Sequence, residues 1–102
     1  FPCDYYPTLG LFAYYKKPGI LEALEFKLPA HVIFDGMDLL TASVESVREH
    51  LRSRDSGLEE DYDTLIARAL GISVWAPDKK EDLLTPCEAV MVFAEGYYDK
   101  RA

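Results

Sequence analysis

Two alternating apolar segments joined by a short polar turn constrain this chain more than any other feature of its sequence. Residues 8–15 alternate in polarity and are rich in aromatic rings, which is typical of a β-strand. The sequence Lys-Lys-Pro-Gly at residues 16–19 supplies a fixed φ and then a permissive one, so it predicts a hairpin to residues 20–27. On the first strand, one face is expected to hold Leu9, Leu11, Ala13 and Tyr15, and the other Phe12 and Tyr14.

One amphipathic helix is predicted after this hairpin. Pro29 should end the second strand, and residues 31–34 suit a short third strand before the Asp-Gly turn. Thr41 or Ser43 can cap a helix that runs to about residue 54. Its buried stripe is formed by apolar residues at i, i+3 and i+7, namely Val44, Val47 and Leu51.

The second half of the chain predicts further strands. The acidic residues 58–63 suit an exposed edge strand or loop, and residues 64–70 suit a helical turn. Residues 71–77 should form a buried strand with Trp75 in the core, and residues 88–93, apolar on both faces, a central strand. The lead-in at 1–7 is expected to be irregular, and the tail at 96–99 a turn with aromatic anchors.

The fold class predicted from these segments is α+β in a single domain, residues 1–102. We expect an antiparallel sheet of about five or six strands with one main amphipathic helix packed on it. Since 49% of the residues are apolar, the chain can bury enough surface to offset its conformational entropy. It should therefore fold without a metal ion or a disulfide.

The charge balance bears on possible partners. With 18 acidic and 11 basic side chains, the net charge of -7 would repel nucleic acid and anionic lipid, but it favours a basic protein partner. The longest apolar run, residues 89–94, is far shorter than the ~20 residues of a membrane helix. We therefore expect a cytoplasmic protein that binds neither nucleic acid nor membrane. The sequence leaves its oligomeric state open.

No catalytic residue, metal ligand or cofactor is predicted. Cys3 and Cys87 match no metal-ligand spacing and are expected to be free thiols. Neither His31 nor His50 has a carboxylate or cysteine at a spacing that would form a metal cluster. The acidic run at residues 55–63 lacks the alternating ligands and the glycine of an EF-hand loop. A solvated acidic surface or a docking surface is the better interpretation.

Residues of the acidic run are the predicted partner-binding site. They combine exposure and charge with one aromatic anchor, and tyrosine is common at protein interfaces. The predicted binding residues are Glu59, Glu60, Asp61, Tyr62 and Asp63.

The order of three segments resembles small bacterial immunity-type proteins, which neutralise secreted toxins. These segments are residues 34–40 before the helix, residues 70–77 as a late strand and residues 96–99 at the end. The resemblance implies a non-enzymatic domain that binds a basic toxin, and it assigns no functional residue.

Two alternative functions stay open at this stage. The first is a small-molecule-binding or hydrolytic domain with a pocket lined by Tyr14, Tyr15 and His31, with Cys87 nearby. The second is a structural subunit that assembles through an exposed sheet edge. A deep pocket with convergent polar groups would favour the first alternative, and a flat acidic face would favour the immunity-type function.

Overall fold

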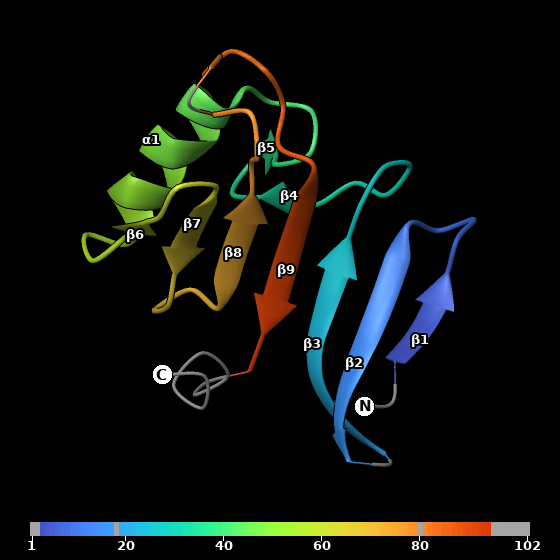
Figure 1. Ribbon diagram of the computed structural model, residues 1–102. Helices are drawn as coiled ribbons and strands as arrows, with labels where there is room; N and C mark the ends of the chain where they lie inside the picture. The colour runs from blue at the N-terminus through green and yellow to red at the C-terminus, as the bar shows by residue number, and fades with distance from the viewer. Residues whose placement is uncertain (1–2, 18, 80, 95–102) are drawn as a thin grey trace.

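The computed structural model describes residues 3–17, 19–79 and 81–94, and it has an α+β fold. Seven strands form one antiparallel sheet in the order β1-β2-β3-β9-β8-β7-β6 (Figure 1). These strands are β1 (Cys3–Tyr6), β2 (Leu11–Lys17), β3 (Ile20–Phe26), β6 (Glu59–Glu60), β7 (Thr64–Ala67), β8 (Ile72–Trp75) and β9 (Ala89–Phe93). The other elements are helix α1 (Val44–Arg54) and a separate hairpin of β4 (Ile33–Phe34) and β5 (Met37–Asp38). The predicted fold class is confirmed, with more strands in the sheet than expected.

Strand β9 occupies the centre of the sheet although it is the last strand in the sequence. It pairs with β3 on one side and with β8 on the other, as the orange-red strand of Figure 1 shows. The two flanking groups, β1-β2-β3 and β8-β7-β6, are therefore joined only through β9. The central strand predicted near residues 88–93 is confirmed.

Helix α1 begins and ends at residues that satisfy its free backbone groups. Ser43 is the N-cap, and its Oγ accepts a hydrogen bond from the backbone N–H of Ser46 at 3.2 Å. The C-cap is Asp55, a buried residue whose carboxylate accepts hydrogen bonds from the backbone N–H groups of Gly57 (2.9 Å) and Ala69 (3.1 Å). Asp55 thus ties the helix end to the turn between β7 and β8.

The core lies between α1 and the β7-β8-β9 part of the sheet. Val44, Val47 and Leu51 are fully buried, as the helical periodicity predicted. They belong to one cluster with sheet residues that include Leu65, Val74 and Val90. Burying side chains of this size contributes roughly 1.5–3 kcal/mol each, so this cluster is the main source of stability.

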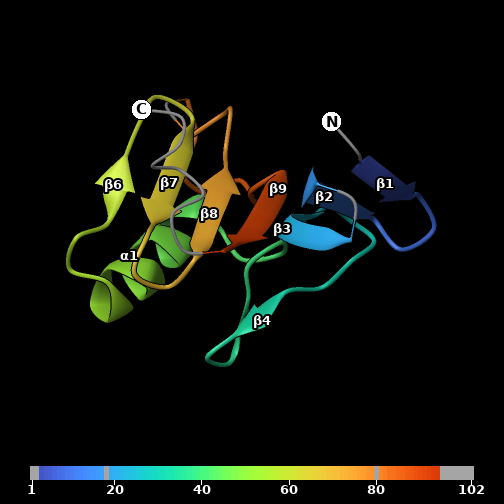
Figure 2. The same ribbon diagram turned by 90° about the horizontal axis from the view of Figure 1, so that it is seen from below.

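The described helix and the separate hairpin cover one face of the sheet. Helix α1 and the β4–β5 hairpin lie on the same side of the sheet (Figure 2). Among the described residues, no helix or strand packs on the opposite side, which we call the uncovered face. Directly paired residues share a face, so the register places one row across all seven strands on it. This row is Tyr5, Phe12, Glu25, Met91, Ser73, Ile66 and Glu59.

Two local predictions were wrong, and both concern strands at the sides of the sheet. The lead-in was expected to be irregular, but Cys3–Tyr6 is strand β1, because the outer edge of β2 is open to pairing. The predicted helical turn is strand β7, Thr64–Ala67, which pairs with β8. Burial alternates along β7, as in a strand with one buried face: Leu65 and Ala67 are buried, whereas Thr64 and Ile66 are half-buried.

The prediction of Trp75 as a core residue was also wrong. Its side chain is 39% exposed, because it lies out of phase with Val74, whose side chain faces the helix. The first predicted hairpin is confirmed by the pairing of β2 with β3. Pro18 of its turn and the predicted tail turn at 96–99 lie outside the described residues.

Gly10 supplies the first test of the fold. Its φ is +66°, its carbonyl accepts a hydrogen bond from the backbone N–H of Lys27 at 2.8 Å, and a Cβ there would clash with the carbonyl of Lys27. We expect Gly10→Ala to lower the free energy of unfolding in urea by about 2–4 kcal/mol. The control is Gly36→Ala, also at positive φ but in open space, which should cost only about 1 kcal/mol. Equal losses for the two variants would contradict the close contact at Gly10.

Candidate functional site

The first two predicted binding residues form ion pairs with other residues of the same chain. Glu59 pairs with the guanidinium of Arg68. The carboxylate of Glu60 lies 3.0 Å from Nζ of Lys79, a buried lysine, and 3.3 Å from Arg48. The hydrogen bond from Lys79, followed by the charges of Lys79 and Arg48, holds the pKa of Glu60 below its usual value, against the opposing effect of burial. Both carboxylates are thus compensated by cations of the same chain.

The other three predicted residues form the turn between β6 and β7. Asp61 is exposed, and its Oδ1 accepts a hydrogen bond from the backbone N–H of Tyr62 at 2.8 Å. The side chain of Tyr62 is 59% exposed. Asp63 accepts hydrogen bonds from Oγ1 of Thr64 (2.9 Å) and Nε1 of Trp75 (3.2 Å), and these two bonds lower its pKa. Asp63 therefore remains ionised at neutral pH and holds the indole of Trp75 in place.

Further carboxylates lie at the end of the sheet that holds Trp75. Trp75 pairs with Thr64 of β7 and with Ala89 of β9, and its carbonyl accepts a hydrogen bond from the N–H of Glu88 at 2.9 Å. The connection from β8 to β9 adds acidic residues to the same end. Within the described part of the chain, the following residues form no ion pair, and we call them the acidic end: Asp61, Asp63, Asp78, Glu81, Asp82 and Glu88.

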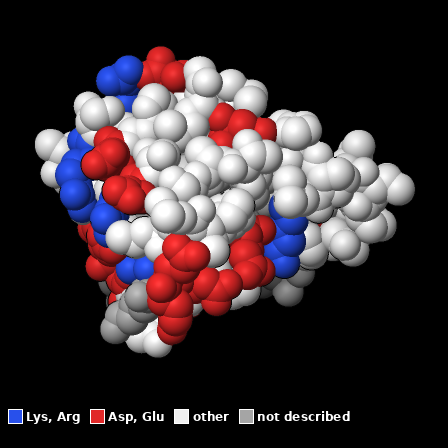
Figure 3. Space-filling model, turned by 90° about the horizontal axis from the view of Figure 1, so that it is seen from above, with Lys and Arg blue, Asp and Glu red and all other residues white. Residues whose placement is uncertain are grey.

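The distribution of charge on the surface agrees with these contacts. Figure 3 looks onto this end of the molecule, and the largest of its groups of Asp and Glu side chains lies at the lower centre of the view. The projecting part at the right, on the side where Figure 1 places β1 and β2, is uncharged in the same view. The surface therefore combines a concentrated negative charge with an uncharged area.

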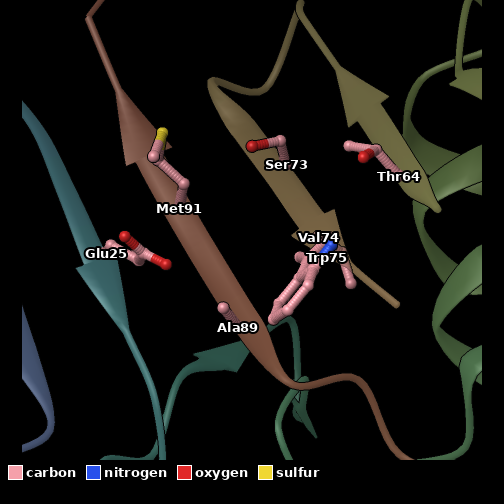
Figure 4. Close-up of a pocket in the computed structure, with 7 residues that line it drawn as sticks. All are labelled: Glu25, Thr64, Ser73, Val74, Trp75, Ala89 and Met91. Carbon is pink, nitrogen blue, oxygen red and sulfur yellow. The ribbon is translucent and has the colours of Figure 1, made fainter. Parts of the chain in front are cut away.

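A hollow of about 170 Å³ opens on the uncovered face beside Trp75 (Figure 4). Glu25 of β3 and Trp75 of β8 lean toward β9, which lies between them. The hydroxyl of Tyr14 donates a hydrogen bond of 2.6 Å to Oε1 of Glu25. The lining residues are Glu25, Thr64, Ser73, Val74, Trp75, Ala89 and Met91. This hollow is not predictable from the sequence, because its residues come from four strands that are separated in the chain.

The residues of the alternative small-molecule pocket are not brought together. Tyr14 and Tyr15 lie on opposite faces of β2, and the hydroxyl of Tyr15 bonds to Asp4. His31 is exposed and its Nδ1 lies 2.7 Å from the carboxylate of Asp38. Cys87 is buried, and burial raises its pKa to about 12, so its thiol is protonated at neutral pH. These four residues therefore do not line one site.

The described residues hold neither a metal cluster nor a membrane-spanning helix. Among residues 3–17, 19–79 and 81–94, no group of three or more His, Cys, Asp or Glu side chains could hold a metal ion. None of the described helices has the length and apolar character needed to cross a membrane. Comparison of the chain with protein-family models, curated proteins and solved structures found no match.

Glu60 and Glu59 provide a matched pair for testing which carboxylates are structural. We expect Glu60→Gln to lower the free energy of unfolding at neutral pH by about 1–3 kcal/mol, because buried Lys79 loses its counter-charge. The adjacent, exposed pair of Glu59 and Arg68 contributes little, so Glu59→Gln should change stability by less than about 1 kcal/mol.

The pH dependence of the Glu60 contribution follows from the direction of its pKa shift. Because the pKa in the folded state is lowered, the stabilisation is complete above the unfolded value of 4.5 and is lost as the pH falls through the folded value. The difference between wild type and Glu60→Gln in urea titrations should therefore shrink in acid. A difference that is zero at neutral pH, or that grows in acid, would contradict this role.

Proposed function

We propose that this chain is a non-enzymatic protein-binding domain that holds a basic protein partner through its acidic end, in the manner of an immunity protein that neutralises a bacterial toxin. The observation that carries the proposal is the acidic end around Trp75, whose carboxylates form no ion pair with any cation among the described residues. The toxin-neutralising role itself rests on the resemblance of the sequence to immunity-type proteins.

Electrostatics supports a basic partner. The net charge of -7 is distributed unevenly over the described residues, because Glu59 and Glu60 are compensated by cations of the chain, whereas no described cation forms an ion pair with the acidic end. A concentrated negative potential accelerates association with a positively charged protein and disfavours acidic partners. Within the predicted binding set, Asp61 and Asp63 are thus better placed to attract a partner than Glu59 and Glu60.

Aromatic residues supply the apolar part of the same surface. Tyr62 and Trp75 are both exposed; Tyr62 precedes Asp63 in the turn, and Trp75 of β8 donates a hydrogen bond to Asp63. Tyrosine and tryptophan are the residues most often found as energetic anchors of protein interfaces. Exposed rings beside the carboxylates of the acidic end suit contact with the long, amphipathic side chains of a basic protein.

One observation favours a second candidate, a subunit of an oligomer. Strand β1 is an edge strand whose four residues, Cys3–Tyr6, are all exposed, so its outer backbone groups could pair with a strand of another copy. Analytical ultracentrifugation over a range of concentrations distinguishes this candidate, since only the oligomer gains mass.

The proposed function is tested with three versions of the chain as bait in a lysate of the source organism. The first is wild type, and the second is the double variant Asp61→Asn/Glu88→Gln. The third is a control, the double variant Glu45→Gln/Glu49→Gln on the helix, which makes the same change in charge elsewhere. We expect wild type and control to retain the same basic protein, and we expect high salt to release it. Binding by the Asp61→Asn/Glu88→Gln variant at low salt should be weaker by roughly tenfold, mainly through slower association.

The recovered protein is then purified and its association rate with each bait is measured. Neutralisation is checked by expressing it in bacteria with and without the chain and comparing growth. Equal binding by the two double variants would contradict the proposed binding surface, as would binding that does not depend on salt. Recovery of no basic protein would count against the function as a whole.

A further inference from the structure

We propose that the hollow beside Trp75 on the uncovered face receives a single arginine side chain of the basic partner. This inference rests on the proposed function and names the group that the partner would contribute. It concerns the sheet face between β3 and β8, which is distinct from the loop carboxylates of the acidic end.

The size of the hollow suits one side chain. Its volume of about 170 Å³ is smaller than the roughly 300–1,000 Å³ typical of small-molecule pockets. Its apolar lining includes Ala89 and Met91 of β9, and Glu25 and Trp75 stand on either side of that strand. An arginine side chain has a matching construction, because its apolar stem ends in a planar cation.

The carboxylate of Glu25 is held ready for a cation. Its Oε1 accepts the hydrogen bond from Tyr14, which restricts the orientation of the group, and no other described residue is bonded to the carboxylate. Oε2 can therefore accept a hydrogen bond from a guanidinium. A charge-assisted bond of this kind is stronger than a neutral one, and a carboxylate fixed in advance loses less entropy on binding.

The rings of the uncovered face already hold one cation. Nζ of Lys27 lies 5.6 Å from the ring centroid of Phe12 and 6.0 Å from that of Trp75. Both distances fall within the range of cation–π attraction, so this surface accepts positive charge in the free protein. Lys27 stands beside the ring that an arginine would use, and its charge opposes a second cation there. Removing Lys27 should consequently strengthen binding.

The hollow is also continuous with the acidic end. The hydrogen bond from Nε1 of Trp75 to Asp63 joins the two directly. A partner drawn by the loop carboxylates would thus meet the uncovered face with its own basic side chains nearest. Charge complementarity and this contact together favour a basic protein over a second copy of this acidic chain.

The test uses a short peptide, acetyl-Gly-Arg-Gly-amide, and its citrulline counterpart, which has nearly the same shape and no charge. Trp75 is the only tryptophan of the chain, so its fluorescence reports on the hollow, and its indole N–H resonance reports on the hydrogen bond to Asp63 beside it. We expect a saturable change with the arginine peptide and none with citrulline. Glu25→Gln should weaken binding roughly fivefold, because the amide keeps the bond from Tyr14 but loses the charge. Lys27→Met should strengthen binding, and the control Glu49→Gln on the helix should leave it unchanged.

Several results would overturn the arginine site: no change at Trp75, an equal response to the citrulline peptide, or unchanged binding by Glu25→Gln. The outcome is separable from that of the proposed function. If Asp61→Asn with Glu88→Gln loses a basic protein while the peptide leaves Trp75 unaffected, only the arginine site fails. If the peptide binds as expected and no basic protein is recovered, the proposed function fails and the hollow remains a cation site.

Discussion

The pairing of β9 with both β3 and β8 is the interaction on which the rest of this structure depends. Without it, the first three strands and the last part of the chain would be two small sheets, each with a short hydrophobic face. With β9 in place, Val90 completes the core under α1. On the other face, Met91 brings Glu25 of β3 and Ser73 of β8 into one row. The hollow therefore exists only because the last strand is inserted in the middle.

Charge is divided within the acidic run in a way that separates stability from recognition. Glu60 approaches buried Lys79 because β6 lies beside the helix and the β8–β9 connection. The charge of Glu60 is therefore neutralised by cations of the same chain. Asp61 and Asp63 are only a few residues away, yet they lie in the turn, where no described cation pairs with them. Neighbours in the sequence thus differ in role, because Glu60 lies in strand β6 near cations and Asp61 and Asp63 lie in the turn that follows.

The parts of the fold that were predictable from sequence are those governed by contacts between near neighbours. The β2–β3 hairpin, the Ser43 cap and the buried stripe of Val44, Val47 and Leu51 all follow from turn chemistry and helical periodicity. Strands β1 and β7 were missed because each is short and is stabilised by pairing with another strand. Trp75 was placed in the core because its size outweighed its position in the alternation of β8.

By itself, the sequence determined the helix, the β2–β3 hairpin, the acidic character and the location of the densest carboxylates, since each depends on residue type and local spacing. Only the tertiary structure decided the strand order, the face that α1 covers and the carboxylates that receive a cation. The physical reason is that a period of two marks two faces of a strand without stating which one a helix will cover. Likewise, the partners of Glu25 and Glu60 come from strands and loops far along the chain, and only the completed sheet brings them within reach.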